Sequence, residues 1–148
     1  MIPQKKLYSE YISNSPCETK EIGKLLAKEL EDQSIIAFFG ELGSGKTTLI
    51  KGLIENTIKI KEDEINSPTF VYLNIYTDKK IICHFDLYRL KNSQQFISLG
   101  FEEYLFSNNI CLIEWSERIE DILPKKMTSV SLFHLNENKR KIKISIRD

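Results

Sequence analysis

The hydrophobic residues of this chain follow two periods, one typical of helices and one typical of strands. Residues 5–12 alternate imperfectly between apolar and polar and predict an edge strand. Ser15, Pro16 and Glu18 then form a capping-box pattern, which predicts that a helix begins here. Apolar residues continue this helix at the expected spacing, namely Ile22, Leu25, Leu26 and Leu30.

Three short apolar runs predict strands that are covered on both faces. Residues 34–39 (SIIAFF) end at Gly40, residues 81–85 end before Asp86, and residues 110–113 end before Glu114. Between the first two runs, a helix from Lys46 to Ile58 carries a wide apolar face of the kind that crosses over a sheet. This order of elements is typical of an α/β domain with parallel strands at its centre.

The remaining segments predict antiparallel strands and short helices. Residues 70–76 alternate at period two, and residues 129–135 and 141–146 do so on either side of a turn, which predicts a hairpin. Residues 93–106 read as two short helices with a break at Gly100. The whole chain, 1–148, is therefore predicted to form a single three-layer α/β domain with a mixed, partly parallel central sheet.

Composition narrows the class of protein further. The chain has 148 residues, close to the usual size of one domain, and 15 aromatic residues (8 Phe, 6 Tyr and 1 Trp) with which to build a core. Lys and Arg number 21, as do Asp and Glu, so no overall basic field exists to hold nucleic acid. Any connection with RNA is therefore expected to be local or indirect.

The cysteines and the amino terminus bear on the cellular compartment. Cys17, Cys83 and Cys111 are widely spaced and form no C-x-x-C pair, so we expect buried thiols in a reducing cytosol. The amino terminus has no apolar signal core, and no apolar stretch approaches the roughly 20 residues of a membrane helix. We expect a cytoplasmic protein that does not enter the membrane.

One motif carries clear chemistry. Residues 40–47 (GELGSGKT) fit the pattern G-x-x-x-x-G-K-[ST], and they lie where the pattern requires, after a buried strand and at the start of a helix. Such a loop exposes successive backbone N–H groups to phosphate oxygens, while its lysine reaches the terminal phosphates and its threonine binds Mg²⁺. The predicted nucleotide contacts here are Glu41, Leu42, Gly43, Ser44, Gly45, Lys46, Thr47 and Thr48.

Two acidic residues are candidates for the chemistry that this loop cannot perform alone. Asp86 and Glu114 each follow an apolar strand, and such a sheet brings the ends of its strands beside the phosphates. One acid is expected to hold the metal, directly or through water, and the other to orient or deprotonate the attacking water. The residues alone do not decide which acid does which.

Other polar residues near these acids have less specific patterns. Residues 67–70 (SPTF) have hydroxyls that suit a nucleotide-sensing switch, although an ordinary turn has the same composition. His84 lies two positions before Asp86, so it shares a sheet face with it, and a structural role is its favoured interpretation. His134, in the predicted hairpin, is interpreted as incidental.

Four motifs taken together resemble one family. GELGSGKTT at 40–48, SPTF at 67–70, HFDLYRL at 84–90 and LIEW at 112–115 match the bacterial TsaE family (formerly YjeE) in order and spacing. The resemblance covers roughly residues 15–125 and implies a small, Mg²⁺-dependent P-loop ATPase, slow on its own. In that family the ATPase works with TsaB and TsaD in making N6-threonylcarbamoyladenosine in tRNA. TsaD performs the transfer, so tRNA is reached through the complex.

The resemblance also implies roles for individual residues. Thr47 and Glu114 become the magnesium contacts, and Asp86 becomes the catalytic acid or base. Lys46, which the P-loop motif already assigns to the terminal phosphates, is the other predicted catalytic residue. Ser67 to Thr69 form a switch element. Three further residues are implied to lie near the bound ATP: Trp115, Pro16 and Thr19.

Three alternatives remain beside this interpretation. A small P-loop kinase shares the loop, but an arginine-bearing lid is not evident in the sequence. A GTPase-like switch usually has the guanine-reading pattern N-K-x-D, whereas Asn138-Lys139 is followed here by Arg140-Lys141. A nucleotide-dependent scaffold that binds ATP without productive turnover has the same motifs as a slow ATPase, so the sequence does not separate the two.

Overall fold

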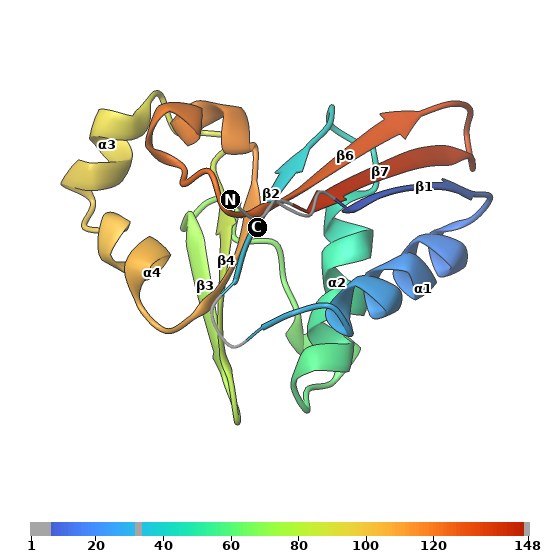
Figure 1. Cartoon of the computed structure of the whole chain (residues 1–148), viewed down its shortest axis with the longest axis horizontal. Coiled ribbons are helices and arrows are strands. Elements are labelled where there is room, and N and C mark those ends of the chain that lie inside the picture. The colour runs from blue at the N-terminus through green and yellow to red at the C-terminus, as the bar shows by residue number, and fades with distance from the viewer. Residues whose placement is uncertain (1–6, 32–33, 147–148) are drawn as a thin grey trace, which may run out of the picture.

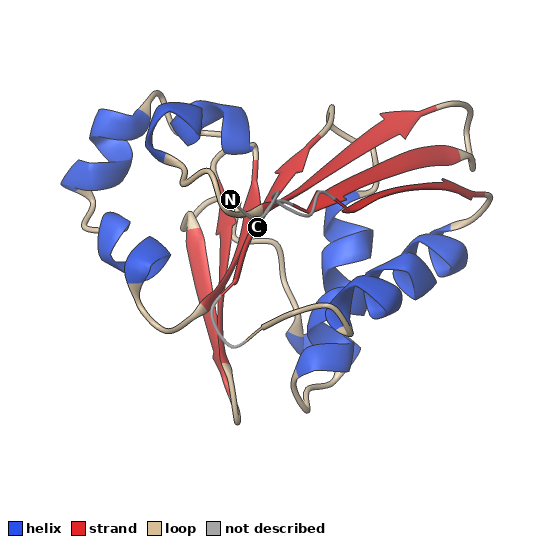
Figure 2. Cartoon of the chain, viewed as in Figure 1, coloured by secondary structure: helices blue, strands red, loops and turns tan. Residues whose placement is uncertain are grey.

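The computed structural model describes residues 7–31 and 34–146, which form a seven-stranded sheet with helices on its two faces (Figures 1 and 2). The strands are β1 (Leu7–Ser13), β2 (Ser34–Phe39), β3 (Leu73–Thr77), β4 (Ile81–Asp86), β5 (Ile110–Glu114), β6 (Thr128–His134) and β7 (Arg140–Ile146). The α-helices are α1 (Pro16–Ala27), α2 (Lys46–Thr57), α3 (Ser93–Ser98) and α4 (Glu102–Phe106), and the 3₁₀ helices are η1 (Glu62–Glu64) and η2 (Ser116–Ile122).

The sheet is mixed, with the strand order β1-β7-β6-β2-β5-β4-β3. Its four central strands, β6, β2, β5 and β4, are parallel, while β3, β7 and β1 join it by antiparallel pairing. The predicted mixed, partly parallel sheet is therefore confirmed, including the antiparallel tail hairpin. Because parallel strands end at the same edge, the carboxyl ends of β2, β4 and β5 meet there, and Asp86 lies directly beside Glu114.

Two hydrophobic cores lie on opposite faces of the sheet. Helices α1 and α2 cover one core, and α3, α4 and η2 lie over the other, as the two groups of helices in Figure 1 show. Strand β4 contributes to both cores because its side chains alternate. Ile82 belongs to the α1–α2 core, while Cys83 and Phe85 belong to the opposite one. His84 and Asp86 consequently face α2.

Helices α1 and α2 approach each other closely through two glycines. A Cβ added at Gly23 would lie 2.2 Å from the carbonyl oxygen of Leu49, and one added at Gly52 would lie 2.3 Å from that of Lys20. Any side chain at either position would therefore push the two helices apart. The close contact fixes the start of α2, and with it the P-loop, against α1.

Several predicted boundaries differ from the structure. The strand predicted over 70–76 begins only at Leu73, because Val71 and Tyr72 both donate their N–H groups to the carbonyl of Pro68 and form a turn, with Tyr72 at φ 68°. The first helix ends at Ala27 rather than Leu30. Residues 5 and 6 of the predicted edge strand lie outside the described residues.

Two further expectations concern single residues. Cys83 and Cys111 are buried as expected, but Cys17 is exposed, because it lies in the first turn of α1 on the side away from the core. At the same helix start, Ser15 Oγ accepts the N–H of Glu18 as predicted, whereas the Glu18 carboxylate accepts the N–H of Asn14 rather than that of Ser15. Within the described ranges, no helix is long and apolar enough to cross a membrane.

Candidate nucleotide-binding site

The loop between β2 and α2 has the backbone that its glycines predict. Gly43 and Gly45 adopt φ values of 80° and 100°, in the left-handed region that side chains disfavour. A Cβ at Gly43 would meet nothing within 4 Å, so its conformation rather than its surroundings requires glycine there. Helix α2 begins directly after this loop, so its free N–H groups and the positive end of its dipole face the loop's interior.

Lys46 lies folded into the loop. Its ammonium donates to the carbonyl oxygens of Gly40 and of Glu41, the latter at 2.9 Å, and lies 4.5 Å from the centre of the Trp115 ring. The side chain is almost fully buried, and this desolvation lowers the pKa of Lys46, although Glu114 and other nearby carboxylates oppose the shift. A poorly solvated cation of this kind gains strongly from an anionic ligand.

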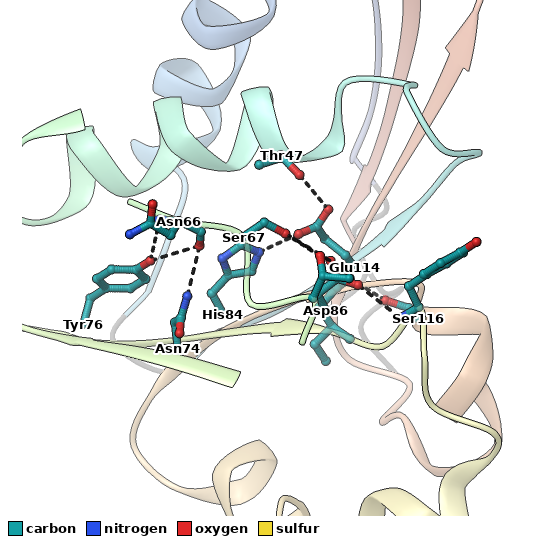
Figure 3. Close-up of polar contacts among 12 residues, drawn as sticks. Thr47, Asn66, Ser67, Asn74, Tyr76, His84, Asp86, Glu114 and Ser116 are labelled. Atoms are coloured by element: carbon teal, nitrogen blue, oxygen red, sulfur yellow. Dashed lines mark hydrogen bonds and ion pairs between the residues drawn. The ribbon is translucent and has the colours of Figure 1, made fainter. Parts of the chain in front are cut away.

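Thr47, Glu114 and His84 form a continuous chain of hydrogen bonds that crosses from α2 to the sheet (Figure 3). The Thr47 hydroxyl donates to Glu114 Oε1 at 3.1 Å, and Glu114 Oε2 lies 2.7 Å from His84 Nε2. Glu114 and His84 are buried. The two oxygens of one carboxylate are thus held by partners from different elements.

Asp86 has a separate set of partners. Its Oδ2 accepts from the hydroxyls of Thr69 at 2.8 Å and Ser67 at 3.2 Å, and its Oδ1 accepts from the backbone N–H of Tyr88 at 3.0 Å. The two hydroxyls belong to the segment that the sequence suggested as a switch. This segment is therefore connected to the rest of the site through the Asp86 carboxylate.

Trp115 has a left-handed backbone, with φ 60° and ψ 45°, which is uncommon for a residue other than glycine. The conformation turns the chain at the end of β5 and directs the indole toward the P-loop lysine. Tyr88 packs against the indole with ring centroids 5.1 Å apart. Backbone conformations of this kind occur often at functional sites, where surrounding contacts hold them in place.

These groups surround one pocket of about 340 Å³. Most of the residues expected to contact a nucleotide line it, namely Pro16, Thr19, Leu42, Gly43, Ser44, Gly45, Lys46, Thr47, Thr48, Thr69 and Trp115. Ser67, Asp86 and Glu114 line it as well. Glu41 is not among the lining residues; its carbonyl instead accepts a hydrogen bond from Lys46.

Several lining residues were not singled out from the sequence. Tyr88 lies within the HFDLYRL block but has no chemistry of its own that marks it. Glu137 and Asn138 come from the β6–β7 turn, and Arg140 is the first residue of β7. The Arg140 guanidinium donates to the carbonyl of Gly43 at 3.2 Å. No local pattern indicates this contact, because the two residues lie 97 positions apart and only the strand order brings them together.

Comparison with known proteins identifies the family of this chain. Residues 13–142 match the family model described as threonylcarbamoyl adenosine biosynthesis protein TsaE. The chain belongs to the TsaE family. It is 43% identical to tRNA threonylcarbamoyladenosine biosynthesis protein TsaE of Rickettsia felis, over 87% of this chain and 75% of that protein. The protein of that name from Treponema pallidum is 34% identical, over 90% and 98% respectively.

A solved structure extends the likeness to three dimensions. The crystal structure of Bacillus subtilis YdiB matches with a TM-score of 0.74 at 28% sequence identity, covering all of this chain and 90% of that one. A curated TsaE protein of the same organism is 33% identical, over 86% of this chain and 79% of the relative. The family suggested by the four sequence motifs and the α/β fold are thus both confirmed.

Proposed function

We propose that this TsaE-family chain binds ATP with Mg²⁺ in the pocket and hydrolyses it, as an accessory protein in N6-threonylcarbamoyladenosine modification of tRNA. The observation that carries the proposal is the convergence of Lys46, Thr47, Asp86 and Glu114 on one pocket beside a glycine-rich loop. Family membership supports the role in tRNA modification, since the relatives carry that function in their names. We further propose that the chain acts in the cytoplasm.

The residues present suit a magnesium ion that accompanies a nucleotide. In such sites one or two protein oxygens hold the ion, and phosphate oxygens and water complete its shell. The hydroxyl of Thr47 and the carboxylate of Glu114, which lie 3.1 Å apart at the pocket wall, supply oxygen ligands of the required kind. The bound ion would offset charge that develops on the phosphates.

Lys46 and Asp86 would have different roles in the hydrolysis. The Lys46 ammonium would leave the carbonyls of Gly40 and Glu41 for the β- and γ-phosphates, which are stronger acceptors. In hydrolysis a water oxygen forms a bond to the γ-phosphorus, the bond from that phosphorus to the bridging oxygen breaks, and ADP leaves. Asp86, whose carboxylate lines the pocket, would take the proton of the attacking water.

A protein partner fits the surface around the pocket. Leu42, Phe70 and Val71 are exposed large apolar residues at or beside the pocket, and the Arg89 guanidinium lies 4.3 Å from the centre of the Phe70 ring. Aromatic residues and arginine are enriched where proteins bind each other tightly. We propose a TsaB–TsaD complex as this partner, and contact with tRNA through that complex, since the net charge of the chain is zero.

One observation favours the second candidate, a scaffold that binds ATP without productive turnover. Both oxygens of Asp86 already accept hydrogen bonds, from Thr69, Ser67 and the Tyr88 amide. A carboxylate whose oxygens already accept hydrogen bonds has fewer lone pairs available for the attacking water. In the proposed ATPase the switch segment must therefore rearrange, and we expect slow turnover without partners for this reason.

The first experiment measures nucleotide binding by calorimetry in wild type, Lys46→Ala and Thr47→Ala. We expect Lys46→Ala to abolish tight ATP binding, because the loop loses the charge that offsets phosphate repulsion. Thr47→Ala should mainly weaken the dependence on magnesium. Wild-type affinity in Lys46→Ala would refute the P-loop assignment.

A second experiment separates the ATPase from the scaffold. ATP turnover and tRNA modification are measured with purified TsaB and TsaD, with and without this chain. Modification that requires both this chain and ATP hydrolysis supports the proposal. Modification that proceeds equally with a non-hydrolysable ATP analogue would favour the scaffold.

A further inference from the structure

His84 is a buried, chemically active side chain that the proposed mechanism does not use. It lies on β4, two residues before Asp86, and is fully buried beneath α2. Leu112 of β5 and Asn74 of β3 are its neighbours across the sheet. His84 is not among the residues that line the pocket, so it does not act on the nucleotide directly.

The histidine instead contacts Glu114. Its Nε2 lies 2.7 Å from Glu114 Oε2, and the two side chains are 0% and 3% exposed. The other carboxylate oxygen, Oε1, accepts the hydroxyl hydrogen of Thr47 at 3.1 Å. An ionised carboxylate only accepts hydrogen bonds, so the histidine proton is assigned to Nε2. Figure 3 shows the Glu114 carboxylate between Thr47 on α2 and His84 on the sheet.

The second ring nitrogen shows that packing alone does not account for this histidine. Nδ1 is buried and has no hydrogen-bond partner among the groups that the structure describes. A buried acceptor without a partner destabilises the fold, and an apolar side chain in this place would avoid that cost. What the histidine supplies in return is the bond from Nε2 to Glu114.

We propose that His84 is a positioning residue that holds the Glu114 carboxylate against Thr47 and so sets the affinity of the site for nucleotide-bound magnesium. The inference rests on the proposed function, because it concerns the magnesium of bound ATP. With its hydrogen committed to Glu114, the Thr47 hydroxyl keeps its lone pairs for the metal. Without His84, Glu114 is free to rotate, and both metal ligands lose their orientation together.

The test compares His84→Leu, His84→Gln and His84→Asn with wild type. ATP affinity is measured by calorimetry over a range of Mg²⁺ concentrations and again in EDTA. A glutamine amide reaches about as far as Nε2, whereas an asparagine amide reaches only as far as Nδ1. Ile82→Val, on the same face of β4, serves as a control for lost packing, and His134→Gln serves as a control for a histidine exposed in the hairpin.

We expect His84→Leu to raise the half-saturating Mg²⁺ concentration by about 10- to 100-fold, the usual effect of removing a residue that orients a metal ligand. Affinity for ATP in EDTA should stay unchanged. His84→Gln should remain close to wild type, and both controls should match it. The inference would be overturned if His84→Leu lost ATP affinity equally in Mg²⁺ and in EDTA, or if its Mg²⁺ dependence matched that of wild type.

If His84→Leu does not fold, the comparison of the glutamine and asparagine variants decides. Wild-type Mg²⁺ dependence in His84→Gln, together with a higher half-saturating Mg²⁺ concentration in His84→Asn, supports the inference. The same Mg²⁺ dependence in both variants overturns it. In a Glu114→Gln background, His84→Leu should cause no further change in Mg²⁺ dependence, so an additive second loss would also overturn it. Wild-type protein that fails to bind ATP would refute the proposed function itself. If wild type binds ATP with Mg²⁺ and His84→Leu has the same Mg²⁺ dependence, this inference alone is refuted.

Discussion

At the scale of single residues, the two carboxylates beside the P-loop differ in their surroundings. Glu114 is buried and bonded to Thr47 and His84, which leaves it facing the first turn of α2. Asp86 is bonded to hydroxyls of a surface segment and to one backbone amide. The contact with the P-loop threonine favours Glu114 as the metal ligand and Asp86 as the proton acceptor.

Asp86→Asn tests this division. The variant is nearly isosteric but cannot accept a proton, so it should bind ATP normally and lose about 100-fold or more in turnover. Binding is measured by calorimetry and turnover by phosphate release. Asp63→Asn, on the exposed η1 helix, is a matched control. If Asp86→Asn loses ATP affinity when magnesium is present but not when it is absent, Asp86 is instead a metal ligand.

Trp115 is the only tryptophan in the sequence, and its indole lines the pocket. Its fluorescence should therefore change when ATP or ADP displaces Lys46 from beside the ring. The measurement is a titration with ATP and with GTP at equal concentration in the presence of magnesium. A larger response to ATP is expected. Equal responses, or none, would count against both the site geometry and the choice of adenine.

At the scale of elements, the β6–β7 turn is the part of the pocket that lies farthest from the P-loop in sequence. Arg140, the first residue of β7, donates to the carbonyl of Gly43 and to three carbonyls of the adjoining turn, those of Asn136, Glu137 and Lys139. These hydrogen bonds hold the turn against the tip of the P-loop. An element held in this way limits the motion of the loop before a ligand arrives.

Arg140→Ala should weaken ATP binding about tenfold, which corresponds to about 1.4 kcal/mol, the size of one good hydrogen bond. Lys139→Ala removes a neighbouring cation that does not line the pocket, so it controls for the change in charge. Both affinities are measured by calorimetry with magnesium present. An equal loss of ATP affinity in both variants would mean that the removed positive charge, rather than the hydrogen bonds of Arg140, is responsible.

At the scale of the whole molecule, the pocket is assembled from segments spread along the chain. The start of α1, the P-loop, the ends of β4 and β5 and the β6–β7 turn all contribute lining residues. A ligand that contacts all of them stabilises the native arrangement of the sheet as a unit. The sequence predicts a single domain over 1–148, and such a domain unfolds in one cooperative step.

MgATP at about 100 times its dissociation constant should therefore raise the free energy of unfolding by about 2.7 kcal/mol, in a single transition. Denaturant unfolding followed by circular dichroism and by Trp115 fluorescence measures both quantities. Lys46→Ala should unfold in one step without the nucleotide effect. Two separate transitions, or probes that disagree, would contradict the prediction of a single domain.

Local sequence patterns were enough to predict most of the helices and strands, the class of the sheet and the family. Continuous apolar runs mark the buried strands that end at Gly40, Asp86 and Glu114. A strand covered on both faces needs apolar residues at successive positions, so such runs indicate it directly in the sequence. The P-loop glycines likewise carry their own conformational signal. Local chemistry was enough to indicate these features.

Contacts between groups that are distant in sequence depend on how the sheet is assembled. A turn at residues 70–72 took the place of the first three residues of the strand predicted over 70–76, because Val71 and Tyr72 both donate to the carbonyl of Pro68. The contact of Arg140 with Gly43 depends on the strand order, and the bond of His84 to Glu114 depends on the register between β4 and β5. Pairing between strands far apart in sequence leaves no periodic trace along the chain, so these contacts become visible only once the sheet is assembled.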